Sequence, residues 1–296
     1  MKKCIFTGSA VAIITPFNET GINFDTLRQL CEFHIANHTD AIVVAGTTGE
    51  ASTMPDIEHI EAIRFVVDIV NKRIPVIAGT GSNDTSHAVK LAINAQNAGA
   101  DALLCVTPYY NKTSQHGLFL HFESVAKAVE IPIILYNVPS RTGMNINPET
   151  ALNLSRISNI VAIKECNLNQ APEVAQLCGD DLTMYSGEDS HVLPILSLGG
   201  KGVISVMANI IPAQTHLMVS SFLAGDFKTA LSLQLEYLPL IKALFSDVNP
   251  IPVKEAMNIL GYKAGPCRMP LCDMSGSNHN ALVEALSLYN LQRGDS

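Results

Sequence analysis

The stretch Ile160-Val161-Ala162-Ile163-Lys164-Glu165-Cys166 is apolar over its first four positions and then carries a lysine and a glutamate. An apolar run without polar alternation predicts a strand covered on both faces, which is typical of parallel sheets. Lysine is seldom buried, because its ammonium group loses hydration that the interior cannot replace. Burial at this strand end lowers the pKa of the Lys164 amine, and a neutral amine is what imine formation requires. An ion pair with Glu165 and a side chain extended into solvent are the alternatives.

Seven further stretches have the same character, since each is rich in aliphatic and β-branched residues and is bounded by turn-forming residues. They are residues 10–17, 41–46, 75–79, 102–108, 132–139, 182–187 and 202–209. Between them, apolar residues recur three or four positions apart, as in amphipathic helices. One helix is expected over residues 55–71 after a cap at Thr53, and the next is expected to start from Ser82 or Asn83 and to end at Gly99.

Eight alternations of strand and helix predict an α/β fold, a (β/α)8 TIM barrel. A doubly wound open sheet is the competing architecture, but no Gly-x-Gly-x-x-Gly turn follows the first strand. After Gly225 the strand signals stop, and helical patterns follow over residues 227–245, 253–260 and 281–291. Pro252 falls at one helix start and Gly261 just past its end. We therefore expect a catalytic barrel over residues 1–225 and an all-helical C-terminal extension over residues 226–296.

The composition excludes several kinds of partner. The net charge of the 296 residues is −8 without a lysine or arginine cluster, which argues against nucleic acid and anionic membranes. The sequence contains no run of about 18 apolar residues, so a membrane span is not expected. The seven cysteines form no Cys-x-x-Cys pair, so free thiols in a reducing cytoplasm are expected. The N-terminal apolar stretch is interrupted by polar residues and Pro16, so a secretory signal is not expected. Only 16% of the residues are charged, which hints at surface buried in an oligomer.

The active site of such a barrel lies at the carboxyl ends of its strands. These ends carry Gly46-Thr47-Thr48-Gly49-Glu50, Gly79-Thr80-Gly81, Thr107-Pro108-Tyr109-Tyr110, Tyr136-Asn137-Val138-Pro139-Ser140-Arg141-Thr142, Lys164-Glu165 and Ser186-Gly187-Glu188-Asp189. Residues two apart in a strand share a face, so Tyr136 points with Ile134, and Lys164 with Ala162. The two strands are expected neighbours, and a phenol beside an amine can relay protons while an imine forms.

Each rim segment also has a purely structural interpretation. The Gly-Thr-Thr-Gly segment could be only a strand-to-helix turn, and Tyr109-Tyr110 could pack in a loop or a subunit contact. Arg141 could form a surface ion pair. The glycine-rich residues 198–202 look like a phosphate loop, but they precede the last strand and are expected to be a turn at the opposite end.

Metal-dependent chemistry is the competing mechanism. His34 and His38 lie four positions apart, and His116, His121 and Glu123 form a second loose group. Both groups fall within or before expected helices, away from the carboxyl ends of the strands. Neither a metal nor another cofactor is therefore expected.

The rim segments together resemble the dihydrodipicolinate synthase family of the pyruvate-dependent class I aldolases. The resemblance runs through the barrel and into Asn249-Pro250-Ile251-Pro252-Val253-Lys254. It implies that Lys164 forms an imine with pyruvate, whose carboxylate is bound by Thr48 near Gly187 and Ile204.

The resemblance also implies a proton relay. Tyr136 donates and accepts protons, and Thr47 links it to Tyr110, which reaches in from a neighbouring subunit. The implied assembly is a homotetramer, built as a dimer of dimers.

Arg141 carries the implied choice of acceptor, because in this family an arginine here holds the carboxylate of aspartate semialdehyde. The implied reaction condenses pyruvate with L-aspartate 4-semialdehyde to 4-hydroxy-tetrahydrodipicolinate in lysine and diaminopimelate biosynthesis. N-acetylneuraminate lyases and 2-keto-3-deoxy sugar acid aldolases, the alternative, usually lack this arginine. A catalytically silent barrel used for binding has no reason to keep a buried amine.

Lysine-sensitive members of the family bind lysine at the dimer interface. The corresponding candidates here are Asn83, Tyr109, His59 and His87. Sensitive members place a glutamate at position 87 against the amino group of the effector, and His87 is never anionic. Ala51 and Asp56 also differ from the serine and histidine often found there, although Asp56 could partly compensate. Feedback inhibition by lysine is therefore expected to be weak or absent.

Overall fold

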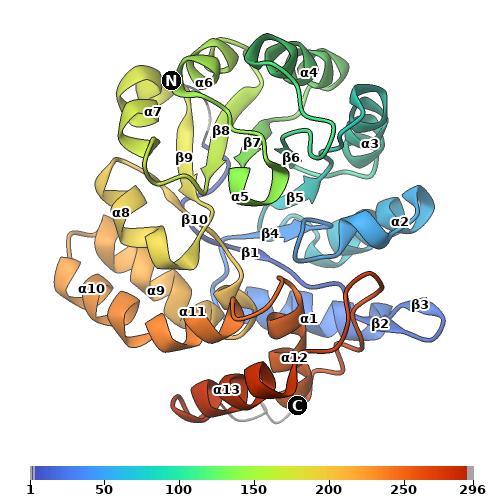
Figure 1. Cartoon of the computed structure of the whole chain (residues 1–296), viewed down its shortest axis with the longest axis vertical. Coiled ribbons are helices and arrows are strands. Elements are labelled where there is room, and N and C mark those ends of the chain that lie inside the picture. The colour runs from blue at the N-terminus through green and yellow to red at the C-terminus, as the bar shows by residue number, and fades with distance from the viewer. Residues whose placement is uncertain (1, 3, 292–296) are drawn as a thin grey trace.

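The computed structural model describes residues 2 and 4–291 and contains a closed barrel of parallel strands in the order β1-β10-β9-β8-β7-β6-β5-β4 (Figure 1). The barrel strands are β1 (Gly8–Ala12), β4 (Ala41–Val44), β5 (Val76–Gly79), β6 (Ala102–Val106), β7 (Ile133–Asn137), β8 (Ile160–Glu165), β9 (Thr183–Ser186) and β10 (Gly202–Ser205). Each lies within or overlaps one of the stretches expected from the sequence, so the (β/α)8 barrel is confirmed.

Helices surround the barrel on the outside (Figure 1). They are α1 (Phe24–Ala36), α2 (Asp56–Val70), α3 (Thr85–Asn97), α4 (Gln115–Ala128), α6 (Pro148–Ser155), α7 (Ala171–Cys178), α8 (Val192–Ser197) and α9 (Pro212–Leu223). The single turn α5 (Pro139–Thr142) lies instead over the middle of the ring, in front of β7 and β8 (Figure 1). Short 3-10 turns follow several strands and one helix, at Ala51–Thr53, Gly179–Asp181, Asp189–His191 and Met207–Asn209. Among the described helices, none is both long and apolar enough to cross a membrane.

Two hydrophobic cores hold the barrel together. The larger lies mainly between the strands and the surrounding helices, and the smaller fills the barrel interior. The interior cluster includes Ile134 and Tyr136 from β7, Ala162 from β8 and Ile204 from β10. The side-chain parity expected for β7 is thereby confirmed, and the same alternation directs Lys164 towards the inside.

The first strand was placed wrongly from the sequence. It spans Gly8–Ala12 instead of residues 10–17, because Gly8 to Val11 pair with β10. Farther on, Phe17 pairs with Ile22 in a small antiparallel hairpin of β2 (Phe17–Asn18) and β3 (Gly21–Ile22). This hairpin was not expected.

Two helix caps also differ from expectation. Thr53 does not cap α2. It ends a 3-10 turn, and its hydroxyl donates to the Glu50 carbonyl, while Pro55 is the residue that precedes the helix. The cap of α3 is Asp84, whose carboxylate accepts from the Ser86 amide at 2.8 Å. Ser82 instead accepts from the Asp84 amide, one turn before the helix begins.

The C-terminal helices lie together on one side of the barrel, coloured orange to red in Figure 1. They are α10 (Phe227–Glu236), α11 (Leu238–Leu244), α12 (Ile251–Ile259) and α13 (Gly276–Ser287). The single helix expected over residues 227–245 is broken at Tyr237, since Pro239 opens the next helix. The division of the chain near Gly225 stays a prediction, and residues 292–296 of the expected extension lie outside the described residues.

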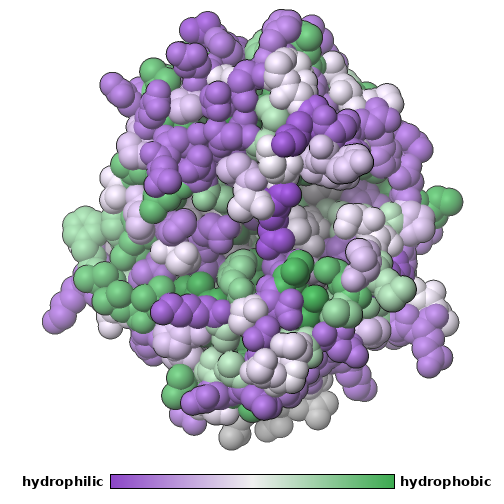
Figure 2. Space-filling view, viewed as in Figure 1, coloured by the Kyte–Doolittle hydropathy of each residue, from purple (hydrophilic) through white to green (hydrophobic). Residues whose placement is uncertain are grey.

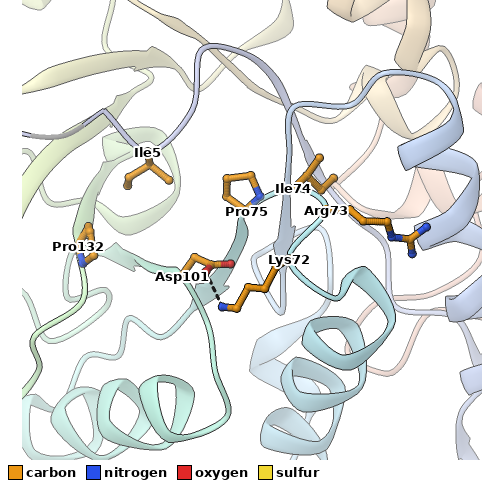
Figure 3. A pocket seen from close by; sticks show the side chains of 7 residues that line it. All are labelled: Ile5, Lys72, Arg73, Ile74, Pro75, Asp101 and Pro132. Atoms are coloured by element: carbon orange, nitrogen blue, oxygen red, sulfur yellow. Dashed lines mark hydrogen bonds and ion pairs between the residues drawn. The ribbon is translucent and has the colours of Figure 1, made fainter.

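A cavity of about 310 Å³ lies at the amino-terminal end of the barrel (Figure 3). Its charged side chains are already paired, because Lys72 contacts Asp101 at 2.7 Å and Arg73 contacts Glu32 at 2.6 Å. The glycine-rich turn at residues 198–202 precedes β10 at this same end, as expected. The chemistry therefore has to be sought at the opposite rim.

Candidate active site

Lys164 lies inside the barrel near its carboxyl rim, with only 5% of its surface exposed. Its strand pairs with β7 in a register that places Lys164 opposite Tyr136. The Lys164 Nζ atom lies 4.4 Å from the centre of the Tyr136 ring. Burial lowers the pKa of the Lys164 amine, and the negative charges of Glu188 and Asp189 oppose this shift only in part. The amine thus has the environment that nucleophilic attack on a carbonyl carbon needs.

Glu165 does not pair with Lys164, because consecutive residues of a strand face opposite sides. Its carboxylate accepts hydrogen bonds from Asn137 Nδ2 at 2.8 Å, the Asn167 amide at 2.7 Å and Gln170 Nε2 at 2.9 Å. Burial raises the pKa of Glu165 to about 7, and these donors oppose the rise. Among the described residues, the Lys164–Glu165 ion pair considered from the sequence is therefore not formed.

The Tyr136 phenol is buried beside this amine. Burial is the main cause that raises its pKa, and hydrogen bonding with Thr47 acts in the opposite direction. Tyr136 therefore keeps its proton at neutral pH and can donate it to a developing oxyanion. Thr47 is exposed at the rim and lines the same cavity as Tyr136.

The loop after β4 brings Thr48 to the site from a fixed backbone. Thr48 is buried, and its hydroxyl accepts from Asn249 Nδ2 at 3.0 Å. The Gly49 carbonyl accepts from the Thr15 hydroxyl at 2.7 Å. Behind them, Lys254 Nζ donates to the buried Glu50 carboxylate at 2.6 Å. The C-terminal helices thus fix this loop at two points.

Gly187 follows β9 and lies against the reactive lysine. A Cβ atom at this position would lie 3.2 Å from Lys164 Cε and would overlap the Cys166 sulfur. Only glycine therefore lets the chain pass this close to the amine. Ile204 is buried in the barrel interior but does not line the cavity, whereas Val206 does.

Arg141 reaches the site from α5, a single turn between β7 and the rest of the rim. The turn begins at Pro139 and closes at Gly143, whose φ of 68° is in the left-handed region. Arg141 is exposed, and within residues 4–291 its guanidinium forms no ion pair. It lines the cavity above Lys164 and is therefore available to an anionic ligand.

The site has two connected parts. A narrow part of about 20 Å³ adjoins Lys164, and a wider part of about 420 Å³ lies beside it. Thr47, Tyr136 and Arg141 line both. The space-filling view shows this face hollowed near its middle (Figure 2).

Three of the four effector-site candidates, His59, His87 and Tyr109, line the wider part, and Asn83 does not. His87 Nε2 contacts Asp56 at 2.9 Å, and the second oxygen of that carboxylate contacts Lys90 at 2.7 Å. These two contacts lower the pKa of Asp56 to about 2. Its negative charge is already paired.

Tyr110 is not brought to the site within this chain. It is 90% exposed and lines neither part of the cavity, while its neighbour Tyr109 lines the wider part. Conversely, Asn249 and Phe245 line the narrow part although sequence reasoning gave them no role. The hydrogen bond from Asn249 to Thr48 joins positions 201 residues apart, which no local pattern reveals.

The residues described leave no group of three or more histidine, cysteine or acidic side chains arranged to hold a metal ion. His34 is buried with Nδ1 bonded to Thr39, and His121 Nδ1 contacts Thr85. Both lie in helices outside the barrel.

A closed parallel barrel with a buried lysine beside a tyrosine at its carboxyl rim defines a (β/α)8-barrel lyase of the class I aldolase type. A family model, the Dihydrodipicolinate synthetase family, matches residues 5–288. The chain belongs to this family.

Individual proteins agree. A 4-hydroxy-tetrahydrodipicolinate synthase of Acetivibrio thermocellus is 58% identical over 291 residues, which cover 98% of this chain and 100% of that protein. The crystal structure of dihydrodipicolinate synthase from Aquifex aeolicus is 46% identical, with a TM-score of 0.95, and covers 98% of this chain and 100% of its own. A monomeric dihydrodipicolinate synthase variant, 35% identical, also has a TM-score of 0.95 and covers 97% and 98% of the two chains.

Proposed function

We propose that this protein is a 4-hydroxy-tetrahydrodipicolinate synthase, which condenses pyruvate with L-aspartate 4-semialdehyde in lysine and diaminopimelate biosynthesis. The observation that carries the proposal is the pairing of the buried Lys164 amine with the Tyr136 phenol across β7 and β8, 4.4 Å from amine to ring centre. Family membership and the arginine at position 141 support this choice of acceptor.

The first half-reaction uses Lys164 as nucleophile. Its amine attacks the ketone carbon of pyruvate, and loss of water gives an imine. Thr48 and the backbone beside Gly187 hold the pyruvate carboxylate, since both adjoin the lysine in the narrow part of the cavity. Loss of a proton from the methyl group converts the imine into an enamine.

The second half-reaction forms the new carbon–carbon bond. The enamine carbon attacks the aldehyde carbon of aspartate semialdehyde, whose carboxylate is bound by Arg141. The amine of that substrate then attacks the imine carbon, and the ring closes as Lys164 leaves. Tyr136 moves the protons in these steps, with its hydroxyl linked to Thr47.

The proton relay continues to Tyr110 of a neighbouring subunit in a homotetramer made of two dimers. Its exposed side chain supports this assignment, because a phenol that is 90% exposed is free to enter another copy of the site. Hydrophobic residues also gather over α10 in Figure 2, and Phe227, Leu231 and Leu235 of this helix are 59%, 50% and 56% exposed.

The remaining parts of the proposal concern cofactor and location. The reaction needs no cofactor, because the Lys164 imine itself supplies the electron sink. The cytoplasm is the proposed location, which agrees with seven free cysteines in the described chain.

The test of this function is a comparison of acceptors. Purified protein with pyruvate should consume aspartate semialdehyde and form the cyclic product, whereas N-acetylmannosamine or other sugar aldehydes should give no measurable turnover. Preferred use of a sugar aldehyde would instead establish the alternative, a sugar acid aldolase.

Feedback inhibition by lysine is expected to be weak or absent. The amino group of a bound lysine would meet His87 in place of a carboxylate, and the nearby Asp56 is already paired with His87 and Lys90. Initial rates measured over a lysine titration should remain nearly constant below millimolar concentrations. Clear inhibition in that range would show that the effector site tolerates His87.

A further inference from the structure

The cavity above Lys164 contains two opposite charges that are not paired with each other. Arg141 and Glu188 both line its narrow part, and no ion pair joins them among the described residues. Neither the family roles nor the reaction outlined above assigns a task to Glu188. Because a charge in a confined cavity is costly unless it meets a partner, Glu188 is a candidate ligand-binding residue.

The backbone of Glu188 is fixed where the side chain leaves it. The Ser186 hydroxyl donates to the Glu188 carbonyl at 2.7 Å, and the Glu188 amide donates to the Ser186 hydroxyl oxygen at 3.3 Å. The side chain is half-buried. The Glu188 carboxylate has the Cys166 thiol as its hydrogen-bonding neighbour and helps to raise the pKa of that thiol. A thiol is only a weak hydrogen-bond donor. The carboxylate therefore keeps most of its capacity to accept hydrogen bonds.

Of the residues that the structure describes, Glu188 is also the only acidic one that lines either part of the cavity. The aldehyde substrate of the proposed reaction carries an α-carboxylate and an α-ammonium group on one carbon atom. Arg141 complements the first, and a single carboxylate in the same cavity complements the second.

An uncharged amide, Asn249, lines the same narrow part of the cavity as Glu188. Asn249 is buried, and its Nδ2 atom donates to the Thr48 hydroxyl at 3.0 Å. Its Oδ1 atom has no hydrogen-bond partner among the described residues. Because this oxygen is enclosed by the protein, the half-buried Glu188 carboxylate is the more accessible acceptor for a ligand in the cavity.

We propose that Glu188 is the specificity-determining residue that binds the α-ammonium group of the amino aldehyde substrate, opposite the Arg141 guanidinium that binds its carboxylate. This inference rests on the proposed function and deepens it. The two contacts together orient the amine of the substrate in the cavity and select an amino acid semialdehyde over an aldehyde acid that lacks the amino group.

The test compares two ligands that differ only in the amino group. Aspartate semialdehyde carries it, and 4-oxobutanoate keeps the carboxylate and the aldehyde but lacks it. In Glu188→Gln, the KM for aspartate semialdehyde should rise at least about 10-fold, as expected for a lost charge-assisted hydrogen bond. The inhibition constant of 4-oxobutanoate should stay within about 2-fold of the wild-type value, because this ligand makes no contact through an amine.

Two further measurements separate binding from a structural effect. Imine formation with pyruvate, followed by borohydride trapping, should be at least as fast in Glu188→Gln as in wild type, because the charge removed favours the protonated, unreactive amine of Lys164. Glu188→Asp keeps the charge and should retain more affinity for the semialdehyde than Glu188→Gln. Glu130→Gln, on the exposed surface, is the matched control and should change nothing.

The proposal is wrong if Glu188→Gln weakens both ligands equally, or if the KM for aspartate semialdehyde is unchanged. A wild-type enzyme that forms the imine but does not consume aspartate semialdehyde would overturn the proposed function and this inference with it. Both proposals are supported if the wild-type enzyme consumes aspartate semialdehyde and Glu188→Gln binds this substrate more weakly while its affinity for 4-oxobutanoate is unchanged.

Discussion

Lys164→Met is expected to abolish turnover, with a loss of roughly four orders of magnitude or more, because no other group in the cavity can form the imine. The same change should leave the melting temperature equal or higher. Burial lowers the pKa of Lys164 from the ordinary value of 10.5, so between the lowered pKa and 10.5 the unfolded chain binds more protons than the folded one. The lysine therefore reduces stability below the ordinary pKa, and this penalty fades as the pH rises towards 10.5. Methionine removes it.

Lys254→Met is the matched control, since Lys254 is also a buried lysine. Its ammonium contacts the buried Glu50 carboxylate at 2.6 Å and donates to the Pro266 carbonyl at 2.7 Å. Removing it leaves a buried carboxylate without its counter-ion, which typically costs about 3–5 kcal/mol. Measurements of thermal unfolding and of turnover should therefore distinguish the two variants. Lys254→Met should unfold at a lower temperature than wild type, and Lys164→Met should be inactive. A large loss of stability in Lys164→Met would mean that this lysine is structural.

Arg141→Ala should weaken the use of aspartate semialdehyde by about two orders of magnitude in kcat/KM, as expected for the loss of a charge-assisted contact to a carboxylate. Imine formation with pyruvate should continue at a similar rate, because the proposed function assigns the pyruvate carboxylate to Thr48 and to the backbone beside Gly187, and not to Arg141. Steady-state kinetics and borohydride trapping measure the two half-reactions separately.

Arg156→Ala, on the exposed end of α6, is the control and should affect neither half-reaction. Equal damage to both half-reactions in Arg141→Ala would instead mean that Arg141 holds the rim in shape.

The sequence predicts the barrel because its strands are continuous apolar runs with clear boundaries. Side-chain alternation was enough to place Tyr136 and Lys164 on the inner face, and the register of β7 and β8 joins them. Cap positions were harder, because Thr53, Ser82, Asn83 and Asp84 all have side chains that can cap a helix. The chain uses Asp84 for α3 and none of them for α2.

Contacts between distant segments could not be predicted from local patterns. Lys254 and Glu50 are 204 residues apart, and Asn249 and Thr48 are 201 residues apart. Both pairs depend on how the C-terminal helices return to the rim after the barrel has closed. Glu188 was visible at the end of its strand, but its unpaired state within the cavity depends on the positions of Arg141 and Cys166.

The most direct test of the account is reduction with borohydride in the presence of pyruvate, followed by peptide mass spectrometry. The account predicts irreversible inactivation that requires pyruvate, with one reduced adduct on Lys164, and full activity in the presence of metal chelators. An adduct on another lysine, no adduct at all, or loss of activity with chelator alone would contradict the Schiff-base mechanism.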